Sequence, residues 1–487
     1  MSNEKEMISL HVDGKEIQAP KGENLLKLLI QHQFKVPYYC YHPGLSVAGA
    51  CRMCFVEIEG QPKPVISCNT TIAPGMKVNT QSTGLTQIRK WNLAFHLINH
   101  PLDCPICDQS GECGLQEYYM KYGRYESDMH EPKVNKRKVV DLGKHVVLDS
   151  ERCILCSRCV RFFDEVTKTS EMAIFNRGDR SEIGTYADRP LTNNYSLCSV
   201  NICPVGALTS KDFRFKKRVW FLKEFKSICP GCSTGCNITM EADIREKRAY
   251  RMLPRYNPDI NGYWMCDYGA MRYKQVNAEH RLLTPQMKQE GKWTPIEWED
   301  ALAFVRKCVA SQTVILITPQ FTVEEIDHIY AFFMKQPTTP RIFHCVDPQS
   351  AFDTTITDEL LMRKDLNPNS QGILQVSKKH KLDHQTLEPF QKYIAQNKIE
   401  TLLVFAPSDL QAYPHFMDWL LPAQPIPNKI VIGTRIELIH SFFNLALPTL
   451  SFAEKSGTFI NVQGISQNIE AGPKLVDNAK PISEILC

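Results

Sequence analysis

Cysteine is the residue type that dominates the chemistry of this sequence. The chain of 487 residues contains 19 cysteines, and all but three of them lie between Cys40 and Cys266. The amino terminus, from Met1 to Gln18, lacks the basic-then-apolar layout of a secretory signal. Close-set cysteines in such a chain indicate metal binding rather than disulfides. Thiolates in C-x2-C loops suit iron–sulfur clusters or zinc, so the choice between these metals decides the function.

The first cysteine group has the spacing C-x10-C-x2-C-x13-C. Its members are Cys40, Cys51, Cys54 and Cys68. Plant-type ferredoxins hold a [2Fe–2S] cluster with a shorter first gap, the same inner C-x2-C and a distant fourth cysteine. The small residues Gly49 and Ala50 allow backbone N–H groups to approach the sulfurs. The group therefore predicts a [2Fe–2S] site, with structural zinc as the alternative.

The second group combines one histidine with three cysteines in the pattern H-x3-C-x2-C-x5-C. Its members are His100, Cys104, Cys107 and Cys113. Three cysteines so close together need a fourth ligand, and His100 is expected at the end of a helix, directly before Pro101. A histidine in that position is more often a helix-terminal residue, but the adjacent cysteines favour ligation. We expect a [4Fe–4S] cluster here, one unit less negative than with four thiolates.

The third group matches the bacterial ferredoxin signature for [4Fe–4S], C-x2-C-x2-C with a distant C-P. Its members are Cys153, Cys156, Cys159 and Cys203. In two-cluster ferredoxins the C-P cysteine serves the other cluster, so the assignment of Cys203 is not automatic. Cys198 is the rival fourth ligand, and it is otherwise interpreted as a small buried hydrophobe.

The fourth group has the spacing C-x2-C-x3-C-x29-C. Its members are Cys229, Cys232, Cys236 and Cys266. Four thiolates could hold [4Fe–4S] or tetrahedral zinc, and an empty site is a further alternative. Cys308, Cys345 and Cys487 have no partners at ligand spacing, which indicates packing or incidental residues.

Composition excludes several classes of function. Hydrophobic residues make up 43% and charged residues 23%, as in ordinary soluble proteins. The formal net charge of +4 argues against a nucleic-acid-binding surface over the whole molecule. No apolar run approaches the ~18 residues of a membrane span. We interpret the basic aromatic stretch 213–226 as an amphipathic strand pair rather than an RNA contact. Residues 133–138 are interpreted as a solvated linker or a docking face for an acidic partner.

The elements that must position these ligands follow from periodicity. Residues 8–12 alternate as a strand, Asp13-Gly14 is a hairpin turn signal, and residues 24–33 have helical periodicity. An amphipathic stretch over 85–100 precedes the second group. After Arg281, apolar runs at 314–318, 402–406 and 430–433 alternate with helical stretches such as 323–334. This pattern predicts an α/β domain with a largely parallel sheet, with 365–384 as a long connection.

Taken in order, the four groups resemble the large iron–sulfur subunit of bacterial NADH–quinone oxidoreductase (respiratory complex I), over roughly residues 6–285. Residues 281–285, 296–298 and 453–461 are similar to molybdopterin-oxidoreductase sequences, whose domain in this family is generally a remnant without molybdenum. The carboxy-terminal domain is much shorter than is usual in the family.

The resemblance implies an α+β multidomain chain with one cluster in each of its first four domains. These are a β-grasp [2Fe–2S] ferredoxin-like domain (1–83), a histidine-plus-three-cysteine [4Fe–4S] domain (84–130), a ferredoxin-like [4Fe–4S] domain (131–220), a molybdopterin-oxidoreductase-type [4Fe–4S] domain (221–280) and a shortened α/β domain without molybdenum (281–487).

The resemblance also implies an electron path. Electrons come from an NADH- and FMN-binding subunit to the Cys40 cluster, then pass to the Cys153 cluster and the His100 cluster. They leave for a ferredoxin-like subunit and finally quinone, whereas the Cys229 cluster lies off this path. Further partners are other peripheral-arm subunits, with no nucleic acid. The expected location is the cytoplasmic face of the bacterial inner membrane, reached through the complex.

We expect no catalytic residues and no NAD or FMN site on this chain. It has neither a G-x-G nor a G-x-x-x-x-G-K-[ST] motif. The nearest alternative is the equivalent relay subunit of a soluble NAD-linked hydrogenase or formate dehydrogenase, which shares the first three cluster motifs. An active formate dehydrogenase would need an intact molybdopterin domain. A zinc-stabilised scaffold without a redox role is the alternative from another class.

Overall fold

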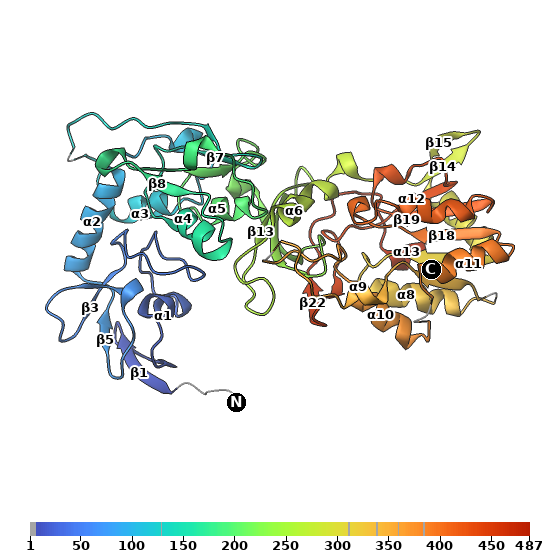
Figure 1. Cartoon of the computed structure of the whole chain (residues 1–487), viewed down its shortest axis with the longest axis horizontal. Helices are drawn as coiled ribbons and strands as arrows, with labels where there is room; N and C mark the ends of the chain where they lie inside the picture. The colour runs from blue at the N-terminus through green and yellow to red at the C-terminus, as the bar shows by residue number, and fades with distance from the viewer. Residues whose placement is uncertain (1–5, 128, 310–311, 338, 359, 383–384) are drawn as a thin grey trace. The chain divides into compact units, whose positions relative to one another are not determined.

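The chain folds into two compact units, Met1–Trp220 and Phe221–Cys487 (Figure 1). The computed structural model describes residues 6–127, 129–309, 312–337, 339–358, 360–382 and 385–487. Among the helices of this described part, none combines the length and the apolar character that crossing a bilayer requires.

The first unit begins with a five-stranded sheet in the order β2-β1-β5-β3-β4. Its strands are β1 (Met7–Val12), β2 (Lys15–Pro20), β3 (Phe55–Ile58), β4 (Val65–Ile66) and β5 (Lys77–Asn79). The predicted hairpin turn is confirmed, since Asp13 and Gly14 both have positive φ, at 48° and 79°. The predicted helix is also confirmed as α1 (Leu25–Gln31), where the side chain of Asn24 accepts a hydrogen bond from the Lys27 amide.

Helix α2 (Thr83–Leu97) leads from this sheet to the second ligand group. The prediction of a helix to His100 is wrong by three residues, because α2 ends at Leu97. Pro101 disfavours helical geometry at the residue before it. The Lys133 ammonium donates to the carbonyls of Leu97 and Ile98, at 3.0 and 2.7 Å, and so satisfies the end of the helix. His100 therefore stands on a short loop beyond the helix.

A three-stranded sheet in the order β10-β7-β6 supports the third ligand group. Besides several 3-10 turns, the further elements of this unit are α3 (Gly114–Tyr122), β6 (Val140–Asp141), β7 (Val146–Leu148), α4 (Arg158–Arg161), the π-helical turn η3 (Phe162–Val166), β8 (Ala173–Phe175), β9 (Glu182–Gly184), α5 (Ser196–Asn201) and β10 (Leu208–Ser210). Leu208 pairs with Leu148 in antiparallel register. Because Cys153 follows β7 by five residues and Cys203 precedes β10 by five, both lie at the same end of this strand pair.

The basic segment 133–138 has no helix or strand, and most of its residues are exposed, as predicted for a solvated linker. Its cations also bond to groups within the unit. Lys138 bonds to Asp103 at 2.7 Å and to Glu151 at 2.8 Å, and Arg137 bonds to Asp188 at 2.9 Å. The segment therefore connects the loop that carries the second ligand group to the loop that carries the third ligand group.

The prediction of a strand pair over residues 213–226 is wrong. Only its last residues form a strand, β11 (Lys223–Ile228), which pairs with β12 (Asn237–Asp243) in the second unit. The earlier part folds over the second ligand group. The Arg218 guanidinium donates to the carbonyls of Cys107 and Pro105, and the Phe215 amide donates to the Asp108 carboxylate at 2.9 Å. These contacts take the place of a strand ladder.

The second unit is built on a seven-stranded sheet in the order β15-β14-β20-β19-β18-β16-β17. Its strands are β14 (Gln286–Gln289), β15 (Lys292–Pro295), β16 (Thr313–Ile317), β17 (Arg341–His344), β18 (Thr401–Phe405), β19 (Asn428–Gly433) and β20 (Leu445–Pro448). The five strands β16, β17, β18, β19 and β20 are parallel, which confirms the predicted largely parallel sheet. Alternate residues of β16 and β18 are buried on opposite faces, as expected for a sheet covered on both sides.

Helices cover both faces of this sheet. They include α7 (Trp298–Val309), α8 (Val323–Met334), α10 (Ser370–Lys379), α11 (Leu387–Gln396), α12 (Phe416–Leu420) and α13 (Ile482–Ile485). The prediction of a helix over 323–334 is confirmed by α8. The prediction that 365–384 is a connection is wrong for its described part, 365–382, since this part contains α10, and residues 383–384 lie outside the described residues. This helix buries polar Gln371 and Ser377 beside Ile373 and Val376, so its apolar stripe is too thin to be detected from the sequence.

The smaller elements of the second unit surround the fourth ligand group. They are β12, β13 (Arg248–Pro254), α6 (Asp267–Ala270), α9 (Pro348–Ala351), β21 (Gly457–Ile460) and β22 (Ser466–Ile469). Two of the segments similar to molybdopterin oxidoreductases meet here. Arg281 and Glu454 form an ion pair at 2.8 Å with neither side chain exposed.

Candidate iron–sulfur sites

The four cysteines of the first group lie close to one another in the first unit, and each is at most 4% exposed. The sulfurs of Cys40 and Cys51 are 3.4 Å apart, and Cys54 shares a side-chain hydrogen bond with Cys68. The bond from Cys51 lowers the pKa of the Cys40 thiol to about 5, although burial opposes this shift. Four buried sulfurs with one already inclined to be a thiolate suit a [2Fe–2S] cluster.

Backbone geometry and α2 hold the loop of the first group. Gly49 and Arg52 have positive φ, at 62° and 55°, which curls the chain around the sulfurs. The Tyr39 amide donates to the Cys51 sulfur at 3.4 Å. From α2, His96 bonds through Nε2 to the Cys51 carbonyl at 3.1 Å. The sequence predicted small residues near the sulfurs but gave no sign of these helix contacts.

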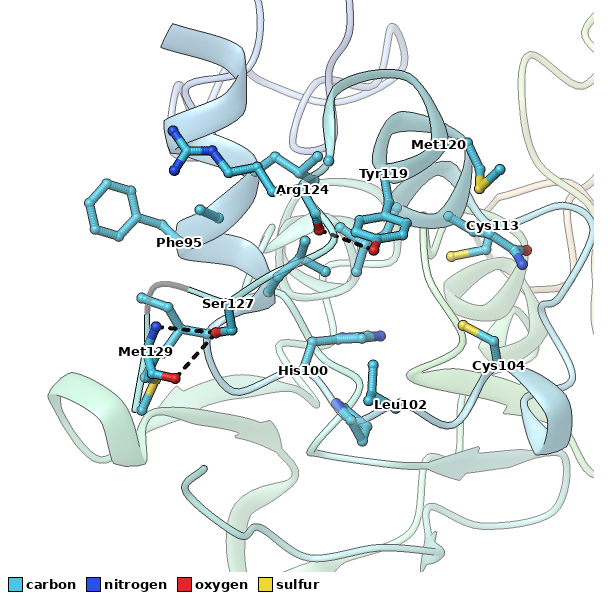
Figure 2. Close-up of a pocket in the computed structure, with 18 of the residues that line it drawn as sticks. Phe95, His100, Leu102, Cys104, Cys113, Tyr119, Met120, Arg124, Ser127 and Met129 are labelled. Carbon is cyan, nitrogen blue, oxygen red and sulfur yellow. Dashed lines mark hydrogen bonds between the residues drawn. The ribbon is translucent and has the colours of Figure 1, made fainter. Parts of the chain in front are cut away.

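The second group lines a cavity of about 1200 Å³ between α2, α3 and the loop that follows α3 (Figure 2). Its four members are His100, Cys104, Cys107 and Cys113. Figure 2 shows the imidazole of His100 and the sulfurs of Cys104 and Cys113 pointing toward the same space. Cys104 is exposed, whereas Cys107 is buried.

His100 is in the state that a metal ligand requires. Burial, with Lys133 and Arg152 nearby, lowers the pKa of His100 to about 4, so the ring is neutral at pH 7. Its Nδ1 atom is buried and accepts or donates no hydrogen bond among the described residues. A buried nitrogen without such a partner is costly, and coordination to a metal would satisfy it. This donor set fits an iron–sulfur cluster.

A glycine brings the second and third groups together. A Cβ atom built on Gly206 would overlap the sulfur of Cys107, so this sulfur keeps its position only beside a glycine. The Gly114 amide, directly after Cys113, donates to the Pro204 carbonyl at 3.1 Å. Gly206 and Pro204 both belong to the C-P segment that follows Cys203. The two groups therefore adjoin through backbone.

The third group lines a small enclosed cavity. Cys153, Cys156, Cys159 and Cys203 all contribute to its wall, together with Ile183, Val205 and Leu208. Cys198, the rival ligand, is 1% exposed in α5 and is not among the residues that line this cavity. Burial raises the pKa of the Cys153 thiol to about 12 and of the Cys156 thiol to about 11. The cavity thus favours neutral thiols until a metal displaces their protons.

Two arginines link the first and third groups, and sequence reasoning missed them. Arg158 donates to the carbonyls of Ile202, at 3.0 Å, and Tyr41, at 2.6 Å. Arg161 donates to the carbonyls of Cys40, at 2.5 Å, and Cys156, at 3.5 Å. The only sequence signal is that Arg158 lies within the C-x2-C-x2-C run and Arg161 two residues after it.

The fourth group is buried in the second unit. Its cysteines, Cys229, Cys232, Cys236 and Cys266, are all near enough for mutual electrostatic interaction. Burial raises the pKa of the Cys229 thiol to about 12, although Arg272 opposes this. The loop that carries the first three is held by the Asn461 side chain, which donates to the Thr234 carbonyl at 3.3 Å, and by the Val462 amide, which donates to the Ser233 carbonyl at 2.9 Å.

The members of each group are related in the structure in one of three ways. Hydrogen bonds join those of the first group, a shared cavity joins those of the second and of the third, and electrostatic contacts join those of the fourth. Within the residues that the structure describes, no group of three or more His, Cys, Asp or Glu side chains is placed so that it could hold a single metal ion.

Four family models match the chain, each over one ligand group. The matches are a 2Fe–2S iron–sulfur cluster binding domain (5–83), an NADH-ubiquinone oxidoreductase-G iron–sulfur binding region (89–128), an NADH-quinone oxidoreductase subunit 3 ferredoxin-like domain (143–209) and a molybdopterin oxidoreductase Fe4S4 domain (222–278). The chain thus carries 2Fe–2S and 4Fe–4S binding domains, which places it in the class of iron–sulfur proteins.

Curated relatives confirm the resemblance to the large iron–sulfur subunit of NADH–quinone oxidoreductase. The iron–sulfur protein 1 of mitochondrial NADH dehydrogenase [ubiquinone] from Solanum tuberosum is 42% identical over 308 residues, which are 63% of this chain and 41% of that protein. The G subunit of NADH-quinone oxidoreductase from Streptomyces coelicolor is 37% identical over 326 residues, which are 66% of this chain and 38% of that protein. The chain therefore spans about two-fifths of the length of these relatives.

Among solved structures, the crystal structure of an NAD+-reducing [NiFe]-hydrogenase in the H2-reduced state is 28% identical, with a TM-score of 0.39. The match covers 44% of this chain and 91% of that chain.

Proposed function

We propose that this chain is the iron–sulfur electron relay of an NADH–quinone oxidoreductase, between an NADH- and FMN-binding subunit and quinone. When bound, each cluster supplies reversible one-electron transfer, and the chain supplies its position and surroundings. The ligands are the four groups described above, with Cys203 rather than Cys198 in the third. One [2Fe–2S] and two [4Fe–4S] clusters form the relay, and a third [4Fe–4S] on the Cys229 group is structural.

The observation that carries this proposal is the continuity of three ligand groups within one unit. Arg161 bonds to a ligand carbonyl of both the first group and the third. Gly206, beside the third group, leaves the space that Cys107 of the second group fills. This sequence of contacts supports the order Cys40 group, Cys153 group, His100 group.

The surroundings of the second group support it as the point where electrons leave. Its ligand Cys104 is exposed. Large apolar side chains that line the same cavity are also exposed, namely Phe95, Leu102, Met120 and Tyr125. Exposed apolar side chains that gather in one place mark interaction surfaces. We assign this face to a ferredoxin-like acceptor subunit, and the chain would reach the cytoplasmic face of the membrane only through the assembled complex.

Iron and acid-labile sulfide in anaerobically purified protein test the proposal. Four filled sites predict about 14 iron atoms per chain with equal sulfide, and reduction by dithionite should give spectra of both cluster types by electron paramagnetic resonance (EPR). About 10 irons would keep the relay and remove the Cys229 cluster. Stoichiometric zinc with little iron would leave a structural scaffold and refute the proposal.

A further inference from the structure

Arg158 and Arg161 lie between the first and third ligand groups. Arg158 donates to the carbonyls of Tyr41, next to Cys40 of the first group, and of Ile202, next to Cys203 of the third. Arg161 donates to the carbonyls of Cys40 itself and of Cys156 of the third group. Arg158 is 9% exposed, and Arg161 is half-buried. Both come from α4, which begins directly after Cys156 and Ser157. The same short helix therefore places two guanidinium groups between two candidate cluster sites.

We propose that Arg158 and Arg161 are positioning residues that fix the spacing of these two clusters and raise the reduction potential of the [2Fe–2S] cluster. This inference rests on the proposed electron relay and deepens it. Reduction adds a negative charge to a cluster, and a fixed cation nearby stabilises that charge. Arg161 bonds directly to the carbonyl of the candidate ligand Cys40.

Arginine suits both tasks better than lysine. Its planar fork of five N–H donors can hold two carbonyls from different segments at once, and its charge persists at all ordinary pH values. Arg161 also donates to the Ser46 carbonyl and to the Ser157 hydroxyl, at 3.2 Å for the latter. The guanidinium thus joins the loop after Cys40 to the segment between Cys156 and Cys159. A lysine would retain the charge but could hold fewer of these acceptors.

Glu165 offers a second way to change the local charge. It lies one helical turn after Arg161, is exposed, and accepts hydrogen bonds from the amide, at 2.8 Å, and the hydroxyl of the same Ser46. Glu165→Gln keeps an oxygen acceptor in place and removes one negative charge near the first group. This variant leaves both arginines untouched, and its position near the surface makes misfolding a minor concern.

The test is an EPR-monitored redox titration of the full chain carrying its clusters, with iron content measured for each variant. Arg161→Gln should shift the midpoint potential of the [2Fe–2S] cluster to a more negative value. Arg161→Lys should stay close to the unaltered protein, because the charge remains. Glu165→Gln should produce a smaller positive shift. Arg180→Gln, on an exposed turn of the same unit, is the matched control and should produce no shift.

An unchanged [2Fe–2S] potential in Arg161→Gln with full iron content would overturn the inference. So would a shift in Arg161→Lys as large as that in Arg161→Gln. If Arg161→Gln fails to retain iron, Glu165→Gln decides, and an absent or negative shift there overturns the inference. A chain that contains no iron–sulfur cluster before any substitution would instead refute the proposed function.

Discussion

At the scale of single residues, the ligand groups depend on neighbours that are not ligands. Gly206 is one of them, because any Cβ at this position would occupy the space of the Cys107 sulfur. Gly114 makes an informative contrast. A Cβ there would lie 3.6 Å from the nearest atom, the Pro204 carbonyl oxygen, which is an ordinary contact. Both glycines adjoin the same pair of ligand groups. Only Gly206, however, lies where a Cβ atom would collide with a neighbouring side chain.

We therefore predict that Gly206→Ala removes the cluster of the second group and that Gly114→Ala does not. The added methyl group would force the Cys107 side chain to rotate away from its partners. Iron content should fall by about four atoms per chain in Gly206→Ala, as expected for one [4Fe–4S] cluster. The check is iron analysis together with the EPR signals of the reduced protein. Full iron content in Gly206→Ala would contradict the packing argument.

At the scale of elements, the cysteine sulfurs lie on short loops that bury them. Neighbouring strands or helix ends hold these loops in place. In the third group, the pairing of β7 with β10 brings Cys153 and Cys203 to one end of a small sheet. Burial there raises the thiol pKa values from 9.0 to about 12 for Cys153 and about 11 for Cys156. A thiol must lose its proton to bind iron, so these loops bind protons and iron in competition.

Iron retention in the third group should therefore weaken as the pH falls. Raised thiol pKa values mean that the folded chain without iron holds its protons tightly below about pH 11, so acid favours the metal-free state. Each proton taken up weakens binding by up to about tenfold per pH unit. Iron remaining after incubation with a chelator at pH 8, 7 and 6 measures this effect. Retention that rises on acidification would contradict it.

At the scale of the whole molecule, a buried ion pair joins distant parts of the second unit. Arg281 donates to Glu454 and also to the carbonyls of Val276, Thr449 and Thr434. Glu454 accepts further bonds from the amides of Ser451, Leu475 and Val476. Burial raises the pKa of Glu454, but Arg281 and the bonds from Ser451 outweigh it and leave the pKa below its usual range.

Replacing this arginine should destabilise the second unit strongly. Arg281→Met would leave the Glu454 carboxylate buried without its cation, at a cost of about 3–5 kcal/mol. Arg248→Met is the matched control, since its pair with Glu279 is nearly half-exposed and contributes about 0–1 kcal/mol. Unfolding in urea, followed by fluorescence, compares the two. Because the Glu454 pKa is lowered, the contribution of the pair is present above about pH 4.5 and is lost as the pH falls further. Equal stability of the two variants would contradict this assignment.

The sequence by itself determined the features that depend on local spacing. Four candidate ligand groups were identified from the close spacing of their cysteines, because chain geometry over a few residues already limits which sulfurs can share a metal. The Asp13-Gly14 turn and helix α8 were predictable for the same reason, since turn chemistry and a strong apolar period are local signals. Helix α10 was not, because its buried face is largely polar.

Tertiary structure decided which distant residues meet. It put Cys203 in the wall of the third cavity and left Cys198 out, tied the basic segment 133–138 to acidic partners, and brought Arg161 to the carbonyl of Cys40. No spacing rule connects residues so far apart in the chain. Their contacts arise from the packing of strands and helices around the loops, and packing depends on the shape of the entire unit.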